Sequence, residues 1–310
     1  MTAVHAVVGA SGNVGRATAL ALRARGAPTR VVLRPARDDS PWRNQGIEAA
    51  VADLEDSRAL ARALEGAASA FVLNPPAYGA PDLFERAVLL ARRIREAARA
   101  ARLPRLMVLS SMGAHLDDGT GIIATNHLFE RLLGDAAPVV CFLRPSYFIE
   151  NWWVAAASAA GEGILRSFLS PVRRAVPMIS AADIGTTAAA LMVQAAVPPR
   201  VVELTGPRSA SPEDVAGAFA RALDRPVVAV ALPRPSWAGV LAGWGFTPVT
   251  VRAWSEMFDG FNSGRIAFER EGTVEHGHTA LDAAVSAWAL RAGAVDRASA
   301  GGPAARVTAC

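Results

Sequence analysis

The chain has 310 residues, 52% of them hydrophobic, so it is long enough for one substantial core and too apolar to remain disordered. Its formal net charge is only +4, and its densest arginine run, residues 92–105, has the spacing of a solvated helix face without interleaved stacking aromatics. No apolar stretch reaches the roughly 20 residues that a membrane span needs, and the first residues do not resemble a signal peptide. We therefore expect a cytoplasmic protein with no nucleic-acid or membrane partner.

Short apolar runs alternate with amphipathic segments through the first half of the chain. Strands are predicted at residues 4–9, 30–33, 47–52, 70–73, 106–109 and 139–143. Helices are predicted between them at residues 14–25, 57–65, 83–101 and 125–133, and Asp56 or Ser57 would cap the second of these helices. This βαβ rhythm predicts an α/β fold with a Rossmann-type, doubly wound parallel sheet.

A smaller, mostly helical C-terminal lobe is expected beside this sheet. Residues 1–155 would form the Rossmann domain, which residues 176–206 complete with a further helix and strand. Residues 156–175 and 207–292 would form the lobe, and the small, polar residues 293–310 would form a disordered tail. Aromatic side chains gather in and beside the lobe, which fits an apolar pocket for a ring-shaped substrate. They are Tyr147, Phe148, Trp152, Trp153, Trp237, Trp244 and Phe261.

A glycine-rich loop joins the first predicted strand to the first predicted helix. Its sequence is Gly9-Ala10-Ser11-Gly12-Asn13-Val14-Gly15. Gly9 permits the tight turn, Gly12 lets the backbone approach a pyrophosphate, and Gly15 lets the helix pack closely on the strand. The N-terminus of the helix supplies unpaired N–H groups and a favourable dipole. Because the motif stands directly between a strand and a helix, it predicts a dinucleotide site.

The end of the second strand decides which dinucleotide fits. NAD sites usually place there an acidic residue that binds the ribose 2′-hydroxyl. This strand is followed instead by Arg34 and Arg37, whose guanidinium groups suit the 2′-phosphate of NADP. Asp38 and Asp39 come next and could compete, so NAD stays open as the lesser alternative. The expected cofactor is NADP.

Polar residues and prolines mark the carboxyl ends of successive strands, where ligands bind in open α/β sheets. Each alone is typical of a turn or a cap, but their coincidence favours a shared ligand. Asp53 and Leu54 would lie near the adenine, and residues 74–76 beside the phosphates and the nicotinamide ribose. The predicted cofactor-binding residues beyond the glycine loop and the arginines are Asp53, Leu54, Asn74, Pro75, Pro76, Ser110, Pro145, Ser146 and Phe148.

Together these segments resemble the NmrA-like family of atypical short-chain dehydrogenases, which includes quinone oxidoreductase-like and isoflavone reductase-like enzymes and redox-sensing regulators. The resemblance implies an NADP-binding domain, a small substrate lobe and a cleft between them, with residues 145–148 lining the nicotinamide pocket. It rests on residues 9–15, 108–114, 142–151, 177–185 and 203–207, with Glu130 ahead of the third segment.

The proton relay of ordinary short-chain dehydrogenases is missing. They use a Tyr-x-x-x-Lys pair, in which the lysine lowers the pKa of the tyrosine. This chain has no lysine, and the resemblance places Ile122 at the tyrosine position and Asn126 at the lysine position. Whether Ser111 or Met112 takes the usual serine position stays open. The candidate catalytic residues are Tyr147, Ser111, His115 and Asn126, with His127 as a further alternative, although the tyrosine could equally be a packed aromatic and either histidine a surface residue.

The cysteines and the paired histidines carry no prediction of a cross-link or a metal. Cys141 lies in an apolar strand and Cys310 ends the printed sequence, so we expect no disulfide and no metal site at either residue. His276 and His278 resemble metal ligands by type alone, and no matching cluster accompanies them.

The leading hypothesis is an NADPH-dependent reductase that transfers a hydride to an apolar carbonyl, quinone or conjugated enone. The missing relay leaves open a non-catalytic, NADP(H)-sensing regulator that binds a protein partner. A redox-neutral isomerase or epimerase, which would keep NADP bound in a biosynthetic pathway, is the third alternative. The expected partner is a small apolar or aromatic substrate, and a homodimer stays open as the assembly.

Overall fold

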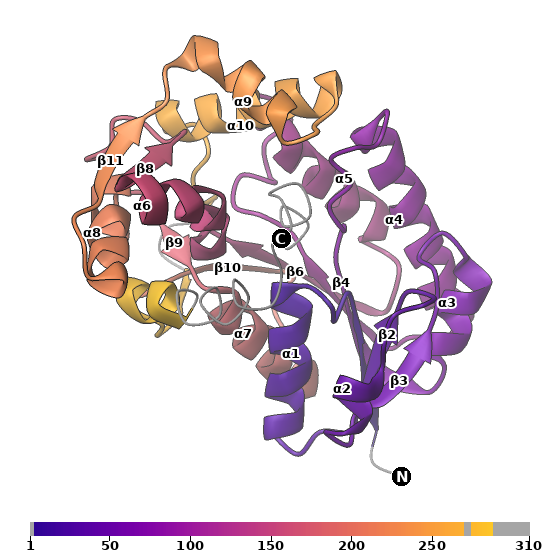
Figure 1. Cartoon of the computed structure of the whole chain (residues 1–310). Coiled ribbons are helices and arrows are strands. Elements are labelled where there is room, and N and C mark those ends of the chain that lie inside the picture. The colour runs from indigo at the N-terminus through magenta and orange to yellow at the C-terminus, as the bar shows by residue number, and fades with distance from the viewer. Residues whose placement is uncertain (1–2, 270–273, 288–310) are drawn as a thin grey trace.

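A parallel sheet of eight strands forms the centre of the protein (Figure 1). The computed structural model describes residues 3–269 and 274–287. The strand order is β12-β10-β6-β5-β4-β1-β2-β3, and the part from β3 to β6 has the 3-2-1-4-5-6 order of the Rossmann fold, which confirms the predicted fold class. The strands are β1 (Val4–Val8), β2 (Thr29–Leu33), β3 (Glu48–Val51), β4 (Ala67–Val72), β5 (Arg105–Leu109), β6 (Val139–Pro145), β10 (Val201–Thr205) and β12 (Glu275–His276).

Helices cover both faces of the sheet, because successive residues of a strand point to opposite sides and both sides are apolar. In β1, Val7 belongs to the core beneath α1 and α7, whereas Ala6 and Val8 belong to the core beneath α3, α4 and α5. Gly185 lets α7 approach α1, since a Cβ at this position would lie 2.5 Å from the Cβ of Ala17. These helices are α1 (Asn13–Ala24), α3 (Ser57–Leu64), α4 (Leu83–Ala100), α5 (Ala124–Leu133) and α7 (Ala181–Val193).

Aspartates begin two of the helices that follow the carboxyl edge of the sheet. The side chain of Asp56 accepts hydrogen bonds from the backbone N–H groups of residues 58 and 59, so the predicted cap of α3 is confirmed. Asp82 caps α4 in the same way. These caps mark the ends of the loops that follow β3 and β4. The loop between β4 and α4 lines the candidate site.

The C-terminal lobe packs around its own aromatic core, with α9 and α10 at the top of Figure 1 and the β8–β11 pair at the left. The rings of Phe168 and Phe258 are stacked with centroids 4.5 Å apart, and Trp237 packs edge-on against both. A second short pair, β7 (Tyr147–Phe148) with β9 (Met178–Ile179), lies where the chain enters and leaves the lobe. The lobe elements are α6 (Ala156–Glu162), β8 (Ile164–Ser167), α8 (Pro212–Leu223), β11 (Val228–Ala231), α9 (Trp237–Gly243) and α10 (Pro248–Ser263).

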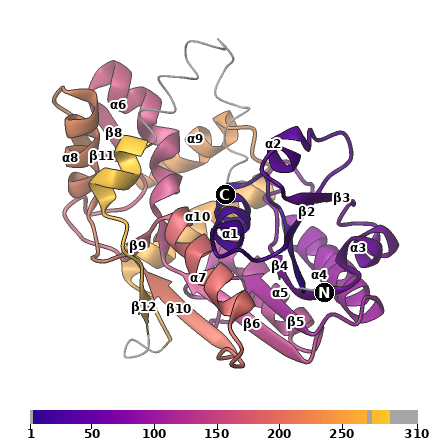
Figure 2. The same ribbon diagram turned by 90° about the horizontal axis from the view of Figure 1, so that it is seen from below.

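The segment after α10 returns to the central sheet, which differs from our assignment of all of residues 207–292 to the lobe. Strand β12 pairs with β10 in parallel (Figure 2), and Asp183 accepts hydrogen bonds from the backbone N and the Oγ1 of Thr279 at 3.0 and 2.9 Å. No apolar run announces this strand, because its residues are glutamate and histidine. The expected tail at residues 293–310 lies outside the described residues. None of the helices that the structure describes is long and apolar enough to cross a membrane.

Candidate functional site

The glycines shape the turn between β1 and α1. Gly9 has a φ of +75°, and the N–H of Gly12 donates a 3.0 Å hydrogen bond to the Gly9 carbonyl. A Cβ at Gly15 would lie 2.3 Å from that carbonyl oxygen, so glycine is required for α1 to approach β1 this closely. A Cβ at Gly12 would meet nothing nearer than the same oxygen at 3.5 Å, and no side chain caps the first turn of α1. The open face of this turn fits an anion such as a pyrophosphate.

Other residues predicted for the cofactor differ in exposure. Ser11 is exposed and Asn13 is half-buried, whereas Val14 is buried in the core beneath α7. At the end of β3, Asp53 is exposed and its carboxylate accepts a backbone N–H within its own turn, while Leu54 packs on the core beneath α3. Val14 therefore supports the fold, Leu54 keeps part of its surface open, and Ser11 and Asp53 remain accessible.

The end of β2 presents two arginines whose neighbouring acids are already engaged. Arg34 and Arg37 are exposed and form no ion pair within residues 3–269 and 274–287. Asp38 accepts hydrogen bonds from the backbone N and the hydroxyl of the serine that begins α2 (Ser40–Arg43), and these bonds lower the pKa of Asp38. Asp39 pairs with the arginine that ends α2 at 2.8 Å. The competing acids are thus held by α2 rather than by the arginines.

A cavity lies where the ends of β4, β5 and β6 face the lobe. Its volume is about 180 Å³, roughly ten times the 10–15 Å³ needed for a single water, so a ring-sized molecule has room there. Pro145 lies outside the lining, because it is buried at the end of β6, where its carbonyl accepts the N–H of Met112 at 2.9 Å. The predicted site residues that the structure brings together in the cavity wall are Asn74, Pro75, Pro76, Ser110, Ser111, Asn126, Ser146, Tyr147 and Phe148.

The lobe closes the cavity with apolar side chains. Trp254, Met257 and Phe261 of α10 line it, and Tyr147 packs edge-on against Phe261 with ring centroids 5.4 Å apart. Phe148, which we also expected beside a substrate, lines the cavity too. Trp152 and Trp237 are buried in the lobe core instead, and the remaining expected tryptophans, Trp153 and Trp244, lie outside the lining.

Tyr78 is a cavity residue that the sequence did not reveal. It lies in the loop between β4 and α4, where its ring packs on Phe246 and Trp254 with centroid distances of 4.7 and 5.5 Å. Thr250 Oγ1 and Thr247 N donate hydrogen bonds to its carbonyl at 3.0 and 3.3 Å, which joins the loop to α10. The sequence did offer one clue to this role. Tyr78 is one of only two tyrosines and comes two positions after the paired prolines at a strand end.

Both positions of the missing proton relay face the cavity. Ile122 and Asn126 line it, so a hydrocarbon side chain and an amide stand where the resemblance expects a phenol and an ammonium. Met112 is 1% exposed and outside the lining, whereas Ser111 lines the cavity and donates its hydroxyl proton to the Met112 carbonyl. Of these two residues, Ser111 is the one that a ligand in the cavity can reach.

His115, which we predicted as a catalytic candidate, lies outside the cavity lining. The chain after β5 makes a turn closed by a 3.0 Å hydrogen bond from the N–H of Ala114 to the Ser111 carbonyl, and His115 directly follows that turn. His127 holds the same turn, because its Nδ1 lies 2.9 Å from the Ala114 carbonyl oxygen. Neither histidine is placed to act on a ligand in the cavity.

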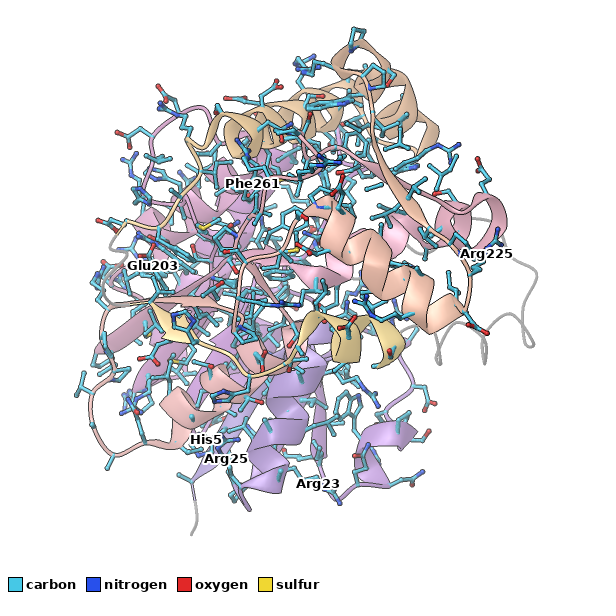
Figure 3. All side chains as sticks on the ribbon, turned by 90° about the vertical axis from the view of Figure 1, so that its left-hand side faces the viewer. His5, Arg23, Arg25, Glu203, Arg225 and Phe261 are labelled. Atoms are coloured by element: carbon cyan, nitrogen blue, oxygen red, sulfur yellow. The ribbon has the colours of Figure 1, made fainter. Side chains whose placement is uncertain are left out.

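A buried ion pair stands directly behind Ser110. Arg144 donates from Nε and Nη2 to the two oxygens of Glu130 at 2.8 and 2.6 Å, and Ser110 Oγ donates to Glu130 Oε1 at 2.5 Å. Arg144 also pairs with Glu269, whose backbone N donates to Glu203 on β10. Figure 3 labels Glu203. Burial alone lowers the pKa of Arg144, but the hydrogen bonds and charges of Glu130 and Glu269 outweigh it and the pKa is raised. The network joins β5, α5, β6 and the segment after α10.

The part of the chain that the structure describes has no arrangement of side chains for a metal ion, and its cysteine is buried. No group of three or more histidine, cysteine or acidic side chains is arranged there to hold a metal ion. His276 lies with Nδ1 3.3 Å from the carbonyl oxygen of Gly206. Cys141 is a buried free thiol in β6, and burial raises its pKa to about 12. His278 is exposed, and Cys310 falls outside the described residues.

Solved structures share this fold at low sequence identity. The chain is similar to an NADPH-dependent quinone oxidoreductase from Escherichia coli solved with NADPH, with 22% identity, 92% of this chain and 99% of that chain covered, and a TM-score of 0.74. The chain is also similar to a triphenylmethane reductase from Citrobacter sp., with 15% identity, 93% of this chain and 99% of that chain covered, and a TM-score of 0.76. A nucleoside-diphosphate-sugar epimerase from Staphylococcus aureus is similar with 12% identity, 92% of this chain and 99% of that chain covered, and a TM-score of 0.74. No curated protein matches the sequence.

The family follows from the sequence match rather than from these distant structures. The profile of the NmrA-like family matches residues 1–262. The match includes the glycine turn, the strand ends around the cavity and nearly all of α10, so it covers both walls of the candidate site. The chain therefore belongs to the NmrA-like family.

Proposed function

We propose that this protein is an NADPH-dependent reductase that transfers a hydride to an apolar carbonyl, quinone or conjugated enone. The observation that carries the proposal is the composition of the cavity. One wall is made by strand ends at which dinucleotides bind in this fold, and the other by aromatic side chains of the lobe. A nicotinamide held by the first wall would face an apolar substrate held by the second.

The residues of the chain fit NADP. The open turn at Gly12 suits the pyrophosphate, Arg34 and Arg37 suit the 2′-phosphate, and Asp53 and Leu54 lie at the strand end next to them for the adenine. Two solved neighbours support the same cofactor, since the quinone oxidoreductase was solved with NADPH and the triphenylmethane reductase with NADP(H). When bound, the cofactor supplies the hydride.

The substrate side of the cavity favours a flat, uncharged ring. Tyr78, Trp254 and Phe261 offer ring faces and edges, and an aromatic pair of this kind contributes about 0.5–1.5 kcal/mol beyond the area it buries. Arg86 is the one charged residue of the lining among the described residues, and it is paired with Glu55 at 2.5 Å. A charged substrate would therefore gain little from this wall.

The oxygen of a reduced carbonyl must take its proton from a group other than a tyrosine–lysine pair. Ile122 has no proton to give, but the lining offers O–H groups, among them the phenol of Tyr147 and the hydroxyl of Ser111. The amide of Asn126 can donate a hydrogen bond to the oxygen. A quinone depends least on such a donor, because its reduced oxyanion is a comparatively weak base and can take a proton from solvent. Quinones are therefore the substrates that suit this lining best.

A non-catalytic NADP(H) sensor is the second candidate, and Ile122 favours it by placing hydrocarbon at the relay position inside the cavity. A sensor would bind the cofactor without consuming it. An epimerase, like the Staphylococcus aureus neighbour, would interconvert its substrate without net consumption of NADPH. Net oxidation of the cofactor therefore separates the leading proposal from both alternatives.

The test is the oxidation of NADPH, followed by the absorbance of its nicotinamide, with naphthoquinone, acetophenone and an aromatic enone as acceptors. Gly12→Ala serves as the matched control, because it fills the proposed pyrophosphate face without a steric clash inside the fold. We expect turnover with the wild type, fastest with the quinone, and a clear loss in the control. Tight binding of NADPH without oxidation of any acceptor would favour the sensor and overturn the proposal.

A further inference from the structure

Ser110 differs from the other serines of the cavity wall in what holds its hydroxyl. Ser111 donates to a backbone carbonyl, and Ser146 donates to the hydroxyl of Thr205 at 3.2 Å. Both hydroxyls meet neutral partners and can rotate toward a ligand. Ser110 donates to the carboxylate of Glu130 at 2.5 Å, and its backbone N–H is fixed to β6 by a 2.7 Å hydrogen bond to the Leu143 carbonyl.

The charge state of Glu130 decides the direction of this hydrogen bond. Arg144 is always protonated and directs one N–H to each oxygen of the carboxylate, in a site where its own side chain is 6% exposed. A carboxylate in a bidentate pair with arginine is ionised and can only accept hydrogen bonds. The proton of the Ser110 hydroxyl must therefore point at Glu130 and not into the cavity.

This direction leaves Ser110 only lone pairs to offer to a ligand. A hydroxyl whose proton is committed still accepts through its oxygen, and its acceptor strength rises because the charged partner polarises the O–H bond. Turning the proton toward the cavity would remove one of the two hydrogen bonds that Glu130 Oε1 accepts from Ser110 and Arg144 in a largely buried site, which is costly. Ser110 thus cannot assist the oxygen that receives a proton during reduction, although it lines the cavity.

We propose that Ser110 is a positioning residue that accepts a hydrogen bond from an N–H or O–H group of the bound ligand, with its polarity set by the Glu130–Arg144 ion pair. The inference rests on the proposed function, because the ligand is the NADP(H)–substrate pair. Two groups have the required chemistry, namely the carboxamide N–H of the nicotinamide and a hydroxyl on the substrate ring. Ser110 is then excluded as a donor to the reduced oxygen, which leaves the other polar groups of the lining, such as Tyr147 and Ser111, and solvent.

The cofactor arm of the test compares binding of NADP with binding of its acetylpyridine analogue, in which a methyl group replaces the carboxamide nitrogen. Calorimetric titration measures both affinities without turnover, for wild type, Ser110→Ala and Ser110→Thr. If the carboxamide is the donor, the wild type should prefer NADP about three- to tenfold more strongly than Ser110→Ala does, as expected for one neutral hydrogen bond. Ser110→Thr keeps the hydroxyl and should restore the preference. Ser158→Ala, in α6 and outside the cavity lining, controls for the loss of a hydroxyl elsewhere.

The substrate arm compares KM for hydroxyacetophenone with KM for methylacetophenone in the same variants. Loss of the preference for the hydroxylated ketone in Ser110→Ala, with the cofactor preference unchanged, would assign the donor to the substrate and support the inference. Binding of NADP by the wild type, with neither preference altered by Ser110→Ala, would overturn the inference alone. A wild type that binds no NADP would overturn the proposed function, and the inference with it.

Discussion

Alanine at Gly15 should lower the stability of the fold, whereas alanine at Gly12 should leave stability nearly unchanged and weaken cofactor binding. At Gly15 the new Cβ would lie 2.3 Å from the oxygen and 2.6 Å from the carbon of the Gly9 carbonyl, and 3.0 Å from the backbone N of Ala10. These are backbone atoms that cannot rotate away, so the cost belongs at the upper end of the roughly 1–3 kcal/mol typical of overpacking. Alanine returns about 1 kcal/mol through its better helix propensity in α1. We expect the free energy of unfolding to fall by about 2 kcal/mol.

At Gly12 the same change meets an open surface. The residue is the N-cap of α1 with φ −89° and ψ 171°, a conformation that alanine adopts without strain, and the nearest atom to the new Cβ is 3.5 Å away. The free energy of unfolding should therefore change by less than about 1 kcal/mol. The methyl group stands on the face proposed for the pyrophosphate, and losing one charged hydrogen bond there, about 1.5–3 kcal/mol, weakens NADPH binding at least tenfold.

Urea unfolding followed by circular dichroism and calorimetric titration with NADPH measure the two quantities separately. A Gly15→Ala variant as stable as the wild type would refute the close packing of α1 on the turn. A stable Gly12→Ala variant that binds NADPH with unchanged affinity would refute the assignment of the turn as the pyrophosphate site.

Three further predictions address the 2′-phosphate, the proton donor and the pH dependence of stability. Arg34→Ala should weaken NADPH binding by about 1.5–3 kcal/mol and leave NADH binding nearly unchanged, since only NADPH loses a charged phosphate contact. Equal weakening of the binding of both cofactors in a titration would contradict this role of Arg34. Tyr147→Phe should lower kcat by about 10- to 100-fold with acetophenone and less with naphthoquinone, and unchanged rates on both would reduce the tyrosine to a packing residue. His5 lies at the end of the sheet remote from Phe261 (Figure 3), where burial first and the charge of Arg105 second lower its pKa below the ordinary 6.5. As the pH falls, the unfolded chain therefore takes up a proton at His5 at a higher pH than the folded chain does. The contribution of His5 to the free energy of unfolding should be full above about pH 6.5 and decrease by up to about 1.4 kcal/mol per pH unit below it. Urea unfolding between pH 5 and pH 7 should show a flatter dependence for His5→Asn, which removes the titrating ring but keeps a polar side chain beside Ser69, and an identical slope in both proteins would exclude His5 as the cause.

The sheet and the glycine-rich turn between β1 and α1 were predictable because their signals are local. The apolar run at residues 139–143 contributes to the cores on both faces of the sheet, and its short length and β-branched residues favour a strand over a helix. The spacing of Gly9, Gly12 and Gly15 is set by contacts within one turn, so the residues report their own geometry. The strand ends around the cavity followed from the parallel direction of the strands.

The features that escaped prediction depend on contacts between distant segments. Strand β12 has two polar residues and exists because β10 offers an edge to it. Tyr78 joins the cavity through α10, which lies far along the chain. His115 is an exception of another kind, because it follows a strand end as Ser111 does but lies outside the cavity lining. The pairing of Arg144 with Glu130 left a clue, since a charged residue inside a buried strand requires an opposite charge nearby.

Transfer of deuterium from NADPH labelled at the hydride position of the nicotinamide to an aromatic ketone or enone tests the proposed activity most directly. The product is isolated and its mass and label position are determined, so the result does not depend on the overall rate. We predict one deuterium on the carbon that was reduced, with a slower reaction for the labelled cofactor. Bound NADPH that keeps its deuterium in the presence of every acceptor would contradict a reductase.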